Sequence, residues 1–594
     1  MSTPGQNGQP EPKHLGVTQP ISEAFPTKED EELTNSLEVT LRAQGLEVVL
    51  GQLDKMVKEF VYKISLRRNL PESVAREAGG KIFTFGSYRL GVHAPGKSGG
   101  SDIDTLCVVP HYVQREDFFS EMHDMLRKRS DVTELTAVSD AFTPVIKMKF
   151  SDIHIDLTFA RLRLSSVQDT LDLKDNGLLR ELDDRCIRSV NGSRVTDEIL
   201  RLVPNVRTFR IALRTIKLWA HRRAIYSNML GFLGGIAWAM LVARICQLYP
   251  NACAATIISR FFTILYKWPW PQPVLLKHIE EGPLQVRVWN PKLYSADRSH
   301  RMPIITPAYP SMCSTHNVTD STKAVILSEF KDAAELVNRI VVEKLPWTKL
   351  FTKDDFFTRY RHYLQVIASS DSEEKHLRWS GLVESRIRHL VMKLERIDNI
   401  VLAHPYVKGF SKVIQYTTPE EKDDAAHGIV KADKPERPAD AEVKTMYTTT
   451  FYIGLCIPAR EAGSTAPRKL DLYKPKEEFT DLVMSWEPFD NQSMHIVVQH
   501  IRSVSLPAEV FEDGDQKKAK RTKSGKKASG TDARPPNKKR RGSAGQNGVT
   551  ASSEGAAAAA TKNPAEASAS LAAVAPAPPV PDAPAPSVPA VPQA

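Results

Sequence analysis

The chain contains Phe85-Gly86-Ser87-Tyr88-Arg89-Leu90 and, after a glycine-rich stretch, Ser101-Asp102-Ile103-Asp104-Thr105-Leu106, and this part of the sequence decides the fold. If the second phrase forms a strand, Asp102 and Asp104 point to the same face, because side chains alternate along a strand. Downstream, Ser151-Asp152-Ile153-His154-Ile155-Asp156-Leu157 alternates in the same way, with its polar side chains on one face. Pairing of the two strands would add Asp152 or Asp156, which share that face, to Asp102 and Asp104 and form a carboxylate triad.

A carboxylate triad of this kind has a defined chemical use. Mg²⁺ is a hard cation that takes carboxylate and phosphate oxygens. Two such ions, roughly 3.5 to 4 Å apart, can activate an attacking hydroxyl and stabilise a leaving pyrophosphate. The Gly86-Ser87 turn adds backbone N–H groups and a hydroxyl that can donate to phosphates. An isolated Asp-x-Asp pair is common in solvated loops, so the prediction of metal-dependent nucleotidyl transfer depends on the combination.

A second motif overlaps the first. Gly91-Val92-His93-Ala94-Pro95-Gly96-Lys97-Ser98 fits the P-loop pattern literally. A P-loop, however, follows a hydrophobic strand directly, and its Lys-Ser pair begins a helix. Here Gly99-Gly100-Ser101 and an acidic strand follow instead, and glycines are poor helix formers. The sequence therefore argues against a P-loop ATPase or GTPase.

Composition separates the middle of the chain from its two ends. Its 594 residues suffice for three or four domains, and 41% hydrophobic residues support sizeable cores. Residues 1–20 are rich in Pro, Gly and Gln, whereas residues 514–594 are rich in Lys, Ala, Pro and Ser with hardly an aromatic. Such segments cannot bury enough apolar surface to fold, so both ends are predicted to be disordered.

The positive charge is concentrated in the C-terminal segment. Between Gly514 and Gly542 there are 12 Lys or Arg and 2 acidic residues, and this excess equals the formal net charge of the whole chain, +10. The remaining residues are neutral on balance, so the basic pI does not indicate a basic nucleic-acid-binding body. The clusters Lys517–Arg521 and Lys538–Arg541 are typical of a nuclear import signal or an RNA tether, with a solvated tail as the alternative.

Several other classes of protein are not expected. The six cysteines show neither CxxC spacing nor paired histidines, so the sequence predicts no zinc site and no disulfide framework. No signal peptide opens the chain. Residues 224–243 lack charge, but their apolar part is shorter than the roughly 20 residues that cross a bilayer. We therefore expect a buried helix there and no membrane partner.

Periodicity predicts an α+β chain of several domains. Residues 32–78 are expected to be helical, with an apolar stripe that includes Leu53, Val57 and Phe60. Residues 81–160 interleave strands with a helix and would form the sheet that carries the triad. The rest is predicted as a mostly helical stretch over 205–350, strands at 390–394, 447–457 and 495–504, a helix near 476–484, and a long loop over 418–441.

Longer phrases identify a family that the chain resembles. They are Asn191-Gly192-Ser193-Arg194-Val195-Thr196-Asp197, Ile216-Lys217-Leu218-Trp219-Ala220, Gly231-Phe232-Leu233-Gly234-Gly235-Ile236-Ala237-Trp238 and Pro307-Ala308-Tyr309-Pro310-Ser311-Met312. With the acidic strand, they resemble the eukaryotic nuclear poly(A) polymerases of the fungal type from about Gly16 to about Asp513. The resemblance implies a nucleotidyltransferase domain of the DNA polymerase beta superfamily (21–204), a helical middle domain (205–353) and an RRM-like RNA-binding domain (354–513).

The resemblance also implies roles for single residues. Asp102, Asp104 and Asp156 match the catalytic, metal-binding triad of the family, which uses two Mg²⁺ or Mn²⁺ ions. Lys147 matches a lysine beside the RNA primer. The positions that match the binding site for the substrate ATP are Phe85, Gly86, Ser87, Asn191, Lys217, Tyr226, Asn228, Gly235, Ile236, Thr306 and Met312. Without the resemblance, Lys217 is equally compatible with an outward-facing lysine and Asn228 with a helix cap.

The expected activity is template-independent addition of AMP from ATP to RNA 3′ ends in the nucleus. The expected partners are the pre-mRNA 3′-end cleavage and polyadenylation complex and an import receptor for the basic tail. One departure is that Gly96-Lys97-Ser98-Gly99-Gly100 adds about four residues to the loop of the family pattern. Two alternatives stay open: a terminal nucleotidyltransferase of the same superfamily that adds UMP or CCA, and a non-catalytic RNA-binding scaffold.

Overall fold

The computed structural model describes residues 15–41, 48–93, 102–139, 141, 143–282, 284, 286–429, 442–458 and 470–511. The predicted C-terminal tail and the longer loop Gly96–Gly100 lie outside the described residues. Residues 15–20, which we predicted to belong to a disordered N-terminal tail, have a defined position in the structure. Thr18 Oγ1 accepts a hydrogen bond of 2.6 Å from Arg244, whose side chain is buried, so this segment gives a buried guanidinium a polar partner.

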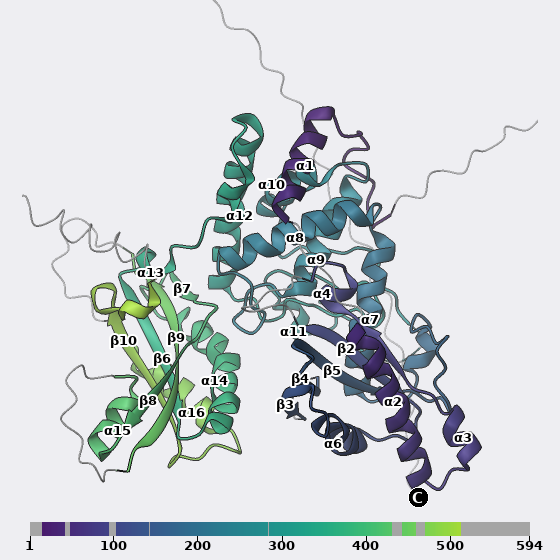
Figure 1. Ribbon diagram of the computed structural model, residues 1–594. Helices are drawn as coiled ribbons and strands as arrows, with labels where there is room; N and C mark the ends of the chain where they lie inside the picture. Colours follow the sequence, from purple (N-terminus) through teal and green to yellow (C-terminus); the bar gives the residue numbers. More distant parts are fainter. Residues whose placement is uncertain are drawn as a thin grey trace, which may run out of the picture. The chain divides into compact units, whose positions relative to one another are not determined.

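A five-stranded sheet in the order β1-β2-β5-β4-β3 forms the first part of the chain. Strands β2 and β5 are parallel and the other neighbours antiparallel. The sheet lies beside α2 and α6 (Figure 1). The strands are β1 (Lys81–Thr84), β2 (Ile103–Val109), β3 (Val132–Val138), β4 (Val145–Phe150) and β5 (Ile153–Arg161), and the helices are α1 (Lys28–Leu41), α2 (Val48–Arg67), α3 (Glu72–Glu77), α4 (Gly86–Arg89), α5 (Arg115–Asp117), α6 (His123–Arg127) and α7 (Asp184–Leu202), with a π-helical turn at Phe118–Met122.

Each face of this sheet has its own apolar cluster. On one face, Leu53, Val57 and Phe60 of α2 pack with Cys107 and other inward residues of the strands, which confirms the predicted apolar stripe for these positions. On the other face, Leu106 and Val108 of β2 and Ala160 of β5 pack with residues of α7. Because side chains alternate, Asp104 and Asp156 share the face that α7 covers. This helix therefore lies next to the acidic strand ends.

Helices dominate the middle of the chain, as predicted. They are α8 (Val206–Arg222), α9 (Gly235–Leu248), α10 (Ala254–Lys267), α11 (Ser295–Arg298) and α12 (Asp320–Val342). Trp219, Trp238 and Phe330 meet in a fully buried aromatic core, with Trp219 and Phe330 stacked at a ring separation of 5.9 Å. Helix α1 packs against α10, although it precedes the sheet in the sequence. Within the described residues, none of the helices combines the length and the apolar character that a bilayer crossing needs.

The last part of the described chain is an antiparallel sheet in the order β10-β6-β9-β7, with β8 paired to β9. Helices α14 and α16 pack on one face of it through Trp379, Val383 and Phe479 (Figure 1). The elements are α13 (Phe356–Arg359), β6 (His362–Ser370), α14 (Glu373–Leu394), β7 (Leu402–Pro405), β8 (Phe410–Tyr416), α15 (Pro419–Ala426), β9 (Lys444–Cys456), α16 (Tyr473–Met484) and β10 (Met494–Arg502).

Two predictions for this part were wrong. Residues 390–394 form the last turns of α14 rather than a strand, because Trp379, Val383 and Ile387 already set a spacing of four that the short apolar run continues. Residues 419–426 form α15 rather than a loop. Thr418 caps this helix by accepting a hydrogen bond from the Glu421 N–H, and proline and acidic residues occupy its first turn. The strands predicted at 447–457 and 495–504 are confirmed as β9 and β10.

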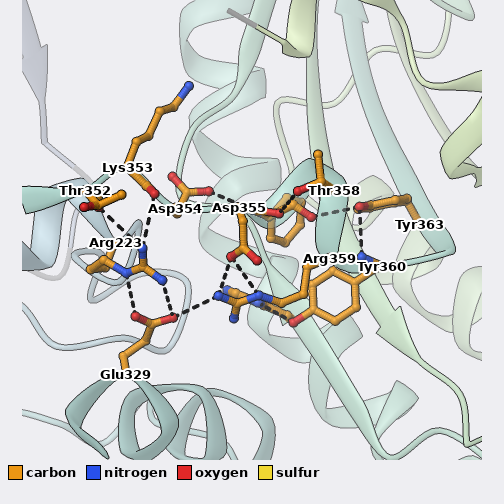
Figure 2. A network of polar contacts seen from close by, with 12 residues as sticks. Arg223, Glu329, Thr352, Lys353, Asp354, Asp355, Thr358, Arg359, Tyr360 and Tyr363 are labelled. Carbon is orange, nitrogen blue, oxygen red and sulfur yellow. Dashed lines mark hydrogen bonds and ion pairs between the residues drawn. The ribbon is translucent and has the colours of Figure 1, made fainter. Parts of the chain in front are cut away.

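A buried ion-pair network joins the end of α8 to α12 and α13 (Figure 2). Glu329, whose side chain is only 3% exposed, accepts from Arg223 Nε at 2.6 Å and from Arg359 Nη2 at 3.1 Å. Arg359 also pairs with Asp355 at 2.5 Å, and Arg223 donates to the carbonyl of Lys353 at 3.2 Å. The network therefore connects the C-terminal end of α8 with the segment that enters the last domain.

Candidate active site

The register of three strands brings the acidic residues together. Asp104 and Asp156 are direct partners in the parallel pair β2 and β5, as the alternation predicted. Asp102 immediately precedes β2 and shares the face of Asp104. On the other side of β5, Lys147 of β4 lies opposite Asp156. The three carboxylates are close enough that Asp102 and Asp156 both influence the pKa of Asp104.

The turn before β2 approaches Asp104 very closely. Gly86 has a φ of +63°, and a Cβ at this position would lie 2.0 Å from Asp104 Oδ2, so the position requires glycine. The Gly86 N–H donates to Thr196 Oγ1 of α7 at 3.2 Å, which fixes the turn on that helix. Ser87 Oγ is buried and has no hydrogen-bond partner among the described residues. A buried hydroxyl without a partner beside a carboxylate pair indicates a ligand-binding position.

A cavity of about 750 Å³ opens beside these residues. Its volume falls within the range of small-molecule sites. Two carboxylates of the predicted triad, Asp102 and Asp104, line it, and so does every residue predicted to bind the nucleotide: Phe85, Gly86, Ser87, Asn191, Lys217, Tyr226, Asn228, Gly235, Ile236, Thr306 and Met312. These residues come from the acidic strand and the turn before it, from α7, α8, the segment between α8 and α9 and the start of α9, and from the loop before α12.

Local contacts hold several of the cavity residues in place. Thr306 and Met312 exchange two hydrogen bonds of 2.9 Å across their loop, from the Thr306 N–H to the Met312 carbonyl and from the Met312 N–H to Thr306 Oγ1. A Cβ on Gly235 would lie 2.6 Å from the Tyr226 hydroxyl, so the glycine makes room for the phenol. Asn191 Oδ1 is buried and unpaired among the described residues, which leaves an acceptor facing the cavity region.

The acidic side of the cavity needs positive charge. Burial, together with the charges of Asp156 and Asp102, raises the pKa of Asp104 to about 7. Burial also raises the pKa of Asp156, although the hydrogen bond and the charge of Lys147 oppose this effect. Carboxylates whose burial disfavours ionisation gain from a cation that binds among them. Oxygen donors alone form this set, and they are the donors that Mg²⁺ and Mn²⁺ prefer.

One carboxylate of the predicted triad, Asp156, is engaged by a lysine. Among the described residues, no group of three or more His, Cys, Asp or Glu side chains is placed to hold a metal ion as it stands. Asp156 Oδ2 instead pairs with Lys147 Nζ at 2.5 Å. The carboxylate oxygens are therefore suitable ligands for a divalent ion, but the ion pair with Lys147 sets the position of the Asp156 carboxylate.

The opposite side of the cavity is basic and aromatic. Burial lowers the pKa of Lys217, and the nearby Asp104 carboxylate partly restores it. Burial also raises the pKa of Tyr226 to about 12, so its hydroxyl stays protonated and can donate a hydrogen bond. His221, one turn beyond Lys217 on α8, stacks on the Tyr226 ring with the centroids 4.0 Å apart.

The lining residues that the sequence reasoning missed include the polar side chains of Arg188, Thr196, His221 and His316. Arg188 precedes Asn191 by three residues on α7, and His221 follows Lys217 by four on α8. Residues at these spacings share one helix face, so helical spacing from a predicted residue could have found both. His316 lies in an irregular loop, and nothing in the pattern of the sequence points to it.

The structure also bears on the competing P-loop motif. Its first residues, Gly91 to His93, follow the short helix α4 rather than a strand, contrary to what a P-loop requires. Its remaining residues, 94–98, lie outside the described residues.

Strand-borne carboxylates on one side of a cavity, with a lysine on its opposite side, are the arrangement expected of a nucleotidyltransferase. Three family descriptions match the chain: "Poly(A) polymerase nucleotidyltransferase domain" over residues 16–203, "Poly(A) polymerase central domain" over 208–353 and "Poly(A) polymerase predicted RNA binding domain" over 355–520. The chain belongs to the poly(A) polymerase family.

Individual relatives agree with this assignment. Poly(A) polymerase pla1 of Schizosaccharomyces pombe is 48% identical over 542 residues, which cover 85% of this chain and 95% of that protein. Poly(A) polymerase PAPa of Candida albicans is 48% identical over 85% of this chain and 94% of that protein. The poly(A) polymerase of Dictyostelium discoideum is 44% identical over 87% of this chain and 62% of that protein. A solved structure of the Cid1 poly(U) polymerase aligns with a TM-score of 0.36 at 16% identity, over 54% of this chain and 99% of that one.

Proposed function

We propose that this protein is a polynucleotide adenylyltransferase that adds AMP from ATP to the 3′ end of RNA without a template. The observation that carries the proposal is the direct pairing of Asp104 with Asp156 at the edge of a nucleotide-sized cavity, in a chain that matches poly(A) polymerases along most of its length. We also propose that the chain is divided into a catalytic domain (21–204), a helical middle domain (205–353) and an RNA-binding domain (354–513).

The carboxylates carry the chemistry in this proposal. Asp102, Asp104 and Asp156 would hold two Mg²⁺ or Mn²⁺ ions, which when bound would acidify the RNA 3′-hydroxyl and neutralise the departing pyrophosphate. The partial burial of Asp104 and Asp156 strengthens every charge interaction at this position. The Gly86 turn can lie this close to the Asp104 carboxylate only because glycine has no side chain, since a Cβ there would lie 2.0 Å from Asp104 Oδ2.

The opposite side of the cavity would bind the nucleotide. Ser87 Oγ would donate to a phosphate oxygen, and the Lys217 ammonium and Tyr226 hydroxyl would contact the triphosphate from α8 and the segment after it. Asn191 Oδ1 would accept from a ribose hydroxyl. The adenine would lie between Asn228, Thr306 and Met312, with Gly235 and Ile236 forming the wall beside it and Phe85 packing behind the turn.

The proposal is tested by primer extension on a short oligoadenylate RNA with Mg²⁺ and each nucleoside triphosphate singly. We expect growth with ATP that is lost in Asp102→Ala. A matched control is Asp152→Ala, which removes a carboxylate next to β5 whose side chain is 96% exposed and pairs with Lys149. Equal growth with Asp102→Ala and native protein would refute the assignment of the triad.

The same assay separates the alternatives. Preferential growth with UTP or CTP would identify a terminal nucleotidyltransferase of other base specificity, with the difference lying around Asn228, Thr306 and Met312. RNA binding without growth on any nucleotide would identify a non-catalytic scaffold.

We further propose that the protein works in the nucleus, within a pre-mRNA cleavage and polyadenylation complex. The two basic clusters, Lys517–Arg521 and Lys538–Arg541, support import through a receptor, because closely spaced Lys and Arg in a segment of low hydrophobicity are the pattern that import receptors bind. Removal of residues 514–594 is expected to leave primer extension intact and to abolish nuclear accumulation of a fluorescent fusion.

A further inference from the structure

Lys147 occupies an unusual position for a surface lysine. It lies opposite Asp156 on the neighbouring antiparallel strand, and its ammonium pairs with Asp156 Oδ2 at 2.5 Å. The Asp156 side chain is only 22% exposed, whereas that of Lys147 is 48% exposed. The lysine therefore approaches from solvent and reaches a carboxylate that is mostly enclosed.

The surroundings explain why a cation is held there. Asp156 shares its face of the sheet with Asp104 and Asp102, and these carboxylates repel one another in a partly dry site. Lys147 offsets part of this repulsion, because its positive ammonium lies 2.5 Å from Asp156 Oδ2. In the described residues no ready-made group of metal ligands exists, and Asp156 Oδ2 is engaged by the Lys147 ammonium.

We propose that Lys147 is an internal counter-ion of the triad, which a divalent metal ion must displace from Asp156 before that carboxylate can act as a ligand. This inference rests on the proposed function, because it concerns the same carboxylates. An ammonium at 2.5 Å from Oδ2 and a divalent ion on the same oxygen repel each other, so the two states exclude one another. The half-exposed lysine stem lets the ammonium swing into solvent, where an RNA phosphate can accept from it.

The consequence is a coupling between metal and RNA. Metal binding frees Lys147, and an anionic primer that binds the freed ammonium favours metal binding by the same factor. The lysine thus offsets part of the negative charge of the triad and weakens metal binding in the absence of substrate. It acts as a positioning residue rather than a catalytic one, because it works through Asp156.

The chain offers a matched control two residues along the same strand. Lys149 lies on the same face of β4, yet it pairs with Glu134 at 3.8 Å and Asp152 at 3.6 Å, away from the triad. Both lysines are partly exposed, with side-chain exposures of 48% and 28%. Replacement of either by methionine removes one positive charge from the same strand and keeps the apolar stem.

The test measures Mn²⁺ binding to the full chain without ATP or RNA, by the electron paramagnetic resonance signal of free Mn²⁺. Asp104→Asn identifies the binding that belongs to the triad. We expect Lys147→Met to bind Mn²⁺ at the triad about tenfold more tightly than native protein. The reason is that the substitution removes one positive charge, partly screened by solvent, that repels the metal ion. Lys149→Met should match native protein, and Lys147→Arg, which restores the charge, should also return the native affinity.

The second readout is the effect of RNA. A short oligoadenylate should tighten Mn²⁺ binding in native protein and Lys149→Met, and clearly less in Lys147→Met. Thermal unfolding in a chelator confirms that each variant is folded. Equal or weaker Mn²⁺ binding by Lys147→Met would overturn the inference while leaving the proposed function standing. Absence of any Mn²⁺ binding that depends on Asp104 would overturn both.

Discussion

Replacement of Gly86 by alanine should separate catalysis from folding. The new Cβ would lie 2.0 Å from Asp104 Oδ2, whereas Cβ atoms in proteins essentially never come within 3.0 Å of a non-bonded atom. The Asp104 carboxylate must therefore move by about 1 Å. A displacement of this size at a reacting centre costs roughly 10²-fold in rate. The φ of +63° adds strain of about 1 to 2 kcal/mol for a residue with a Cβ. We therefore expect kcat for AMP addition to fall about 100-fold with only a modest loss of stability.

The assay is primer extension at saturating ATP, combined with thermal unfolding in a chelator. The matched control is Gly51→Ala in α2, where a Cβ meets no atom within 4 Å and the residue is exposed. This substitution should raise stability by about 0.5 to 1 kcal/mol, because alanine favours the helix, and should leave kcat unchanged. A Gly86→Ala protein that retains native kcat would show that the position of Asp104 does not limit the reaction.

Three further predictions follow from the site and its surroundings. His221→Ala should raise KM for ATP about two- to tenfold in steady-state assays, through the loss of the stack on Tyr226, and His221→Phe should restore it, because the aromatic contact returns. The pKa of Asp104, about 7, lies above its usual value, so the stability of the metal-free protein falls as pH rises from about 4 to about 7. The increase in Tm that Mg²⁺ produces should therefore be larger at about pH 8 than at about pH 6, because at pH 8 the Asp104 carboxyl has already lost its proton. An equal increase at the two pH values would contradict the assigned pKa. Glu329→Ala should destabilise the protein by about 3 kcal/mol in denaturant unfolding, because Arg223 and Arg359 lose their buried counter-ion. A loss below about 1 kcal/mol would show that Glu329 does not stabilise the two arginines.

The acidic strands were predictable because their information is local. Alternation over Asp102 to Leu106 and over Asp152 to Leu157 fixes which side chains share a face, and the structure then pairs Asp104 with Asp156 as expected. The pairing of Lys147 with Asp156 was not predictable from the residues alone. It depends on the register of β4 against β5, which long-range packing sets.

Errors occurred where a short pattern lay within a longer one. The apolar run at 390–394 suits a strand on its own, but the helical spacing that begins at Trp379 extends over it. The segment after Thr418 has a low apolar content, which favoured a loop. A cap, a proline at the first turn and two acidic residues nevertheless stabilise α15, and Ala425 and Ala426 are buried against the sheet.

Helix α8 connects the nucleotide side of the cavity to the last domain. Its final turns carry Lys217 and His221, and Arg223, directly after its last residue, is held by the buried carboxylate of Glu329. Burial, together with the charges of Lys217 and of Lys408 in the last domain, lowers the pKa of His221 to about 4. His221 is therefore neutral near pH 7, so at the nucleotide site that we propose, Lys217 rather than His221 carries the positive charge. A neutral imidazole stacked on Tyr226 orients the phenol, for which we propose a contact with the triphosphate, without adding a second positive charge beside Lys217.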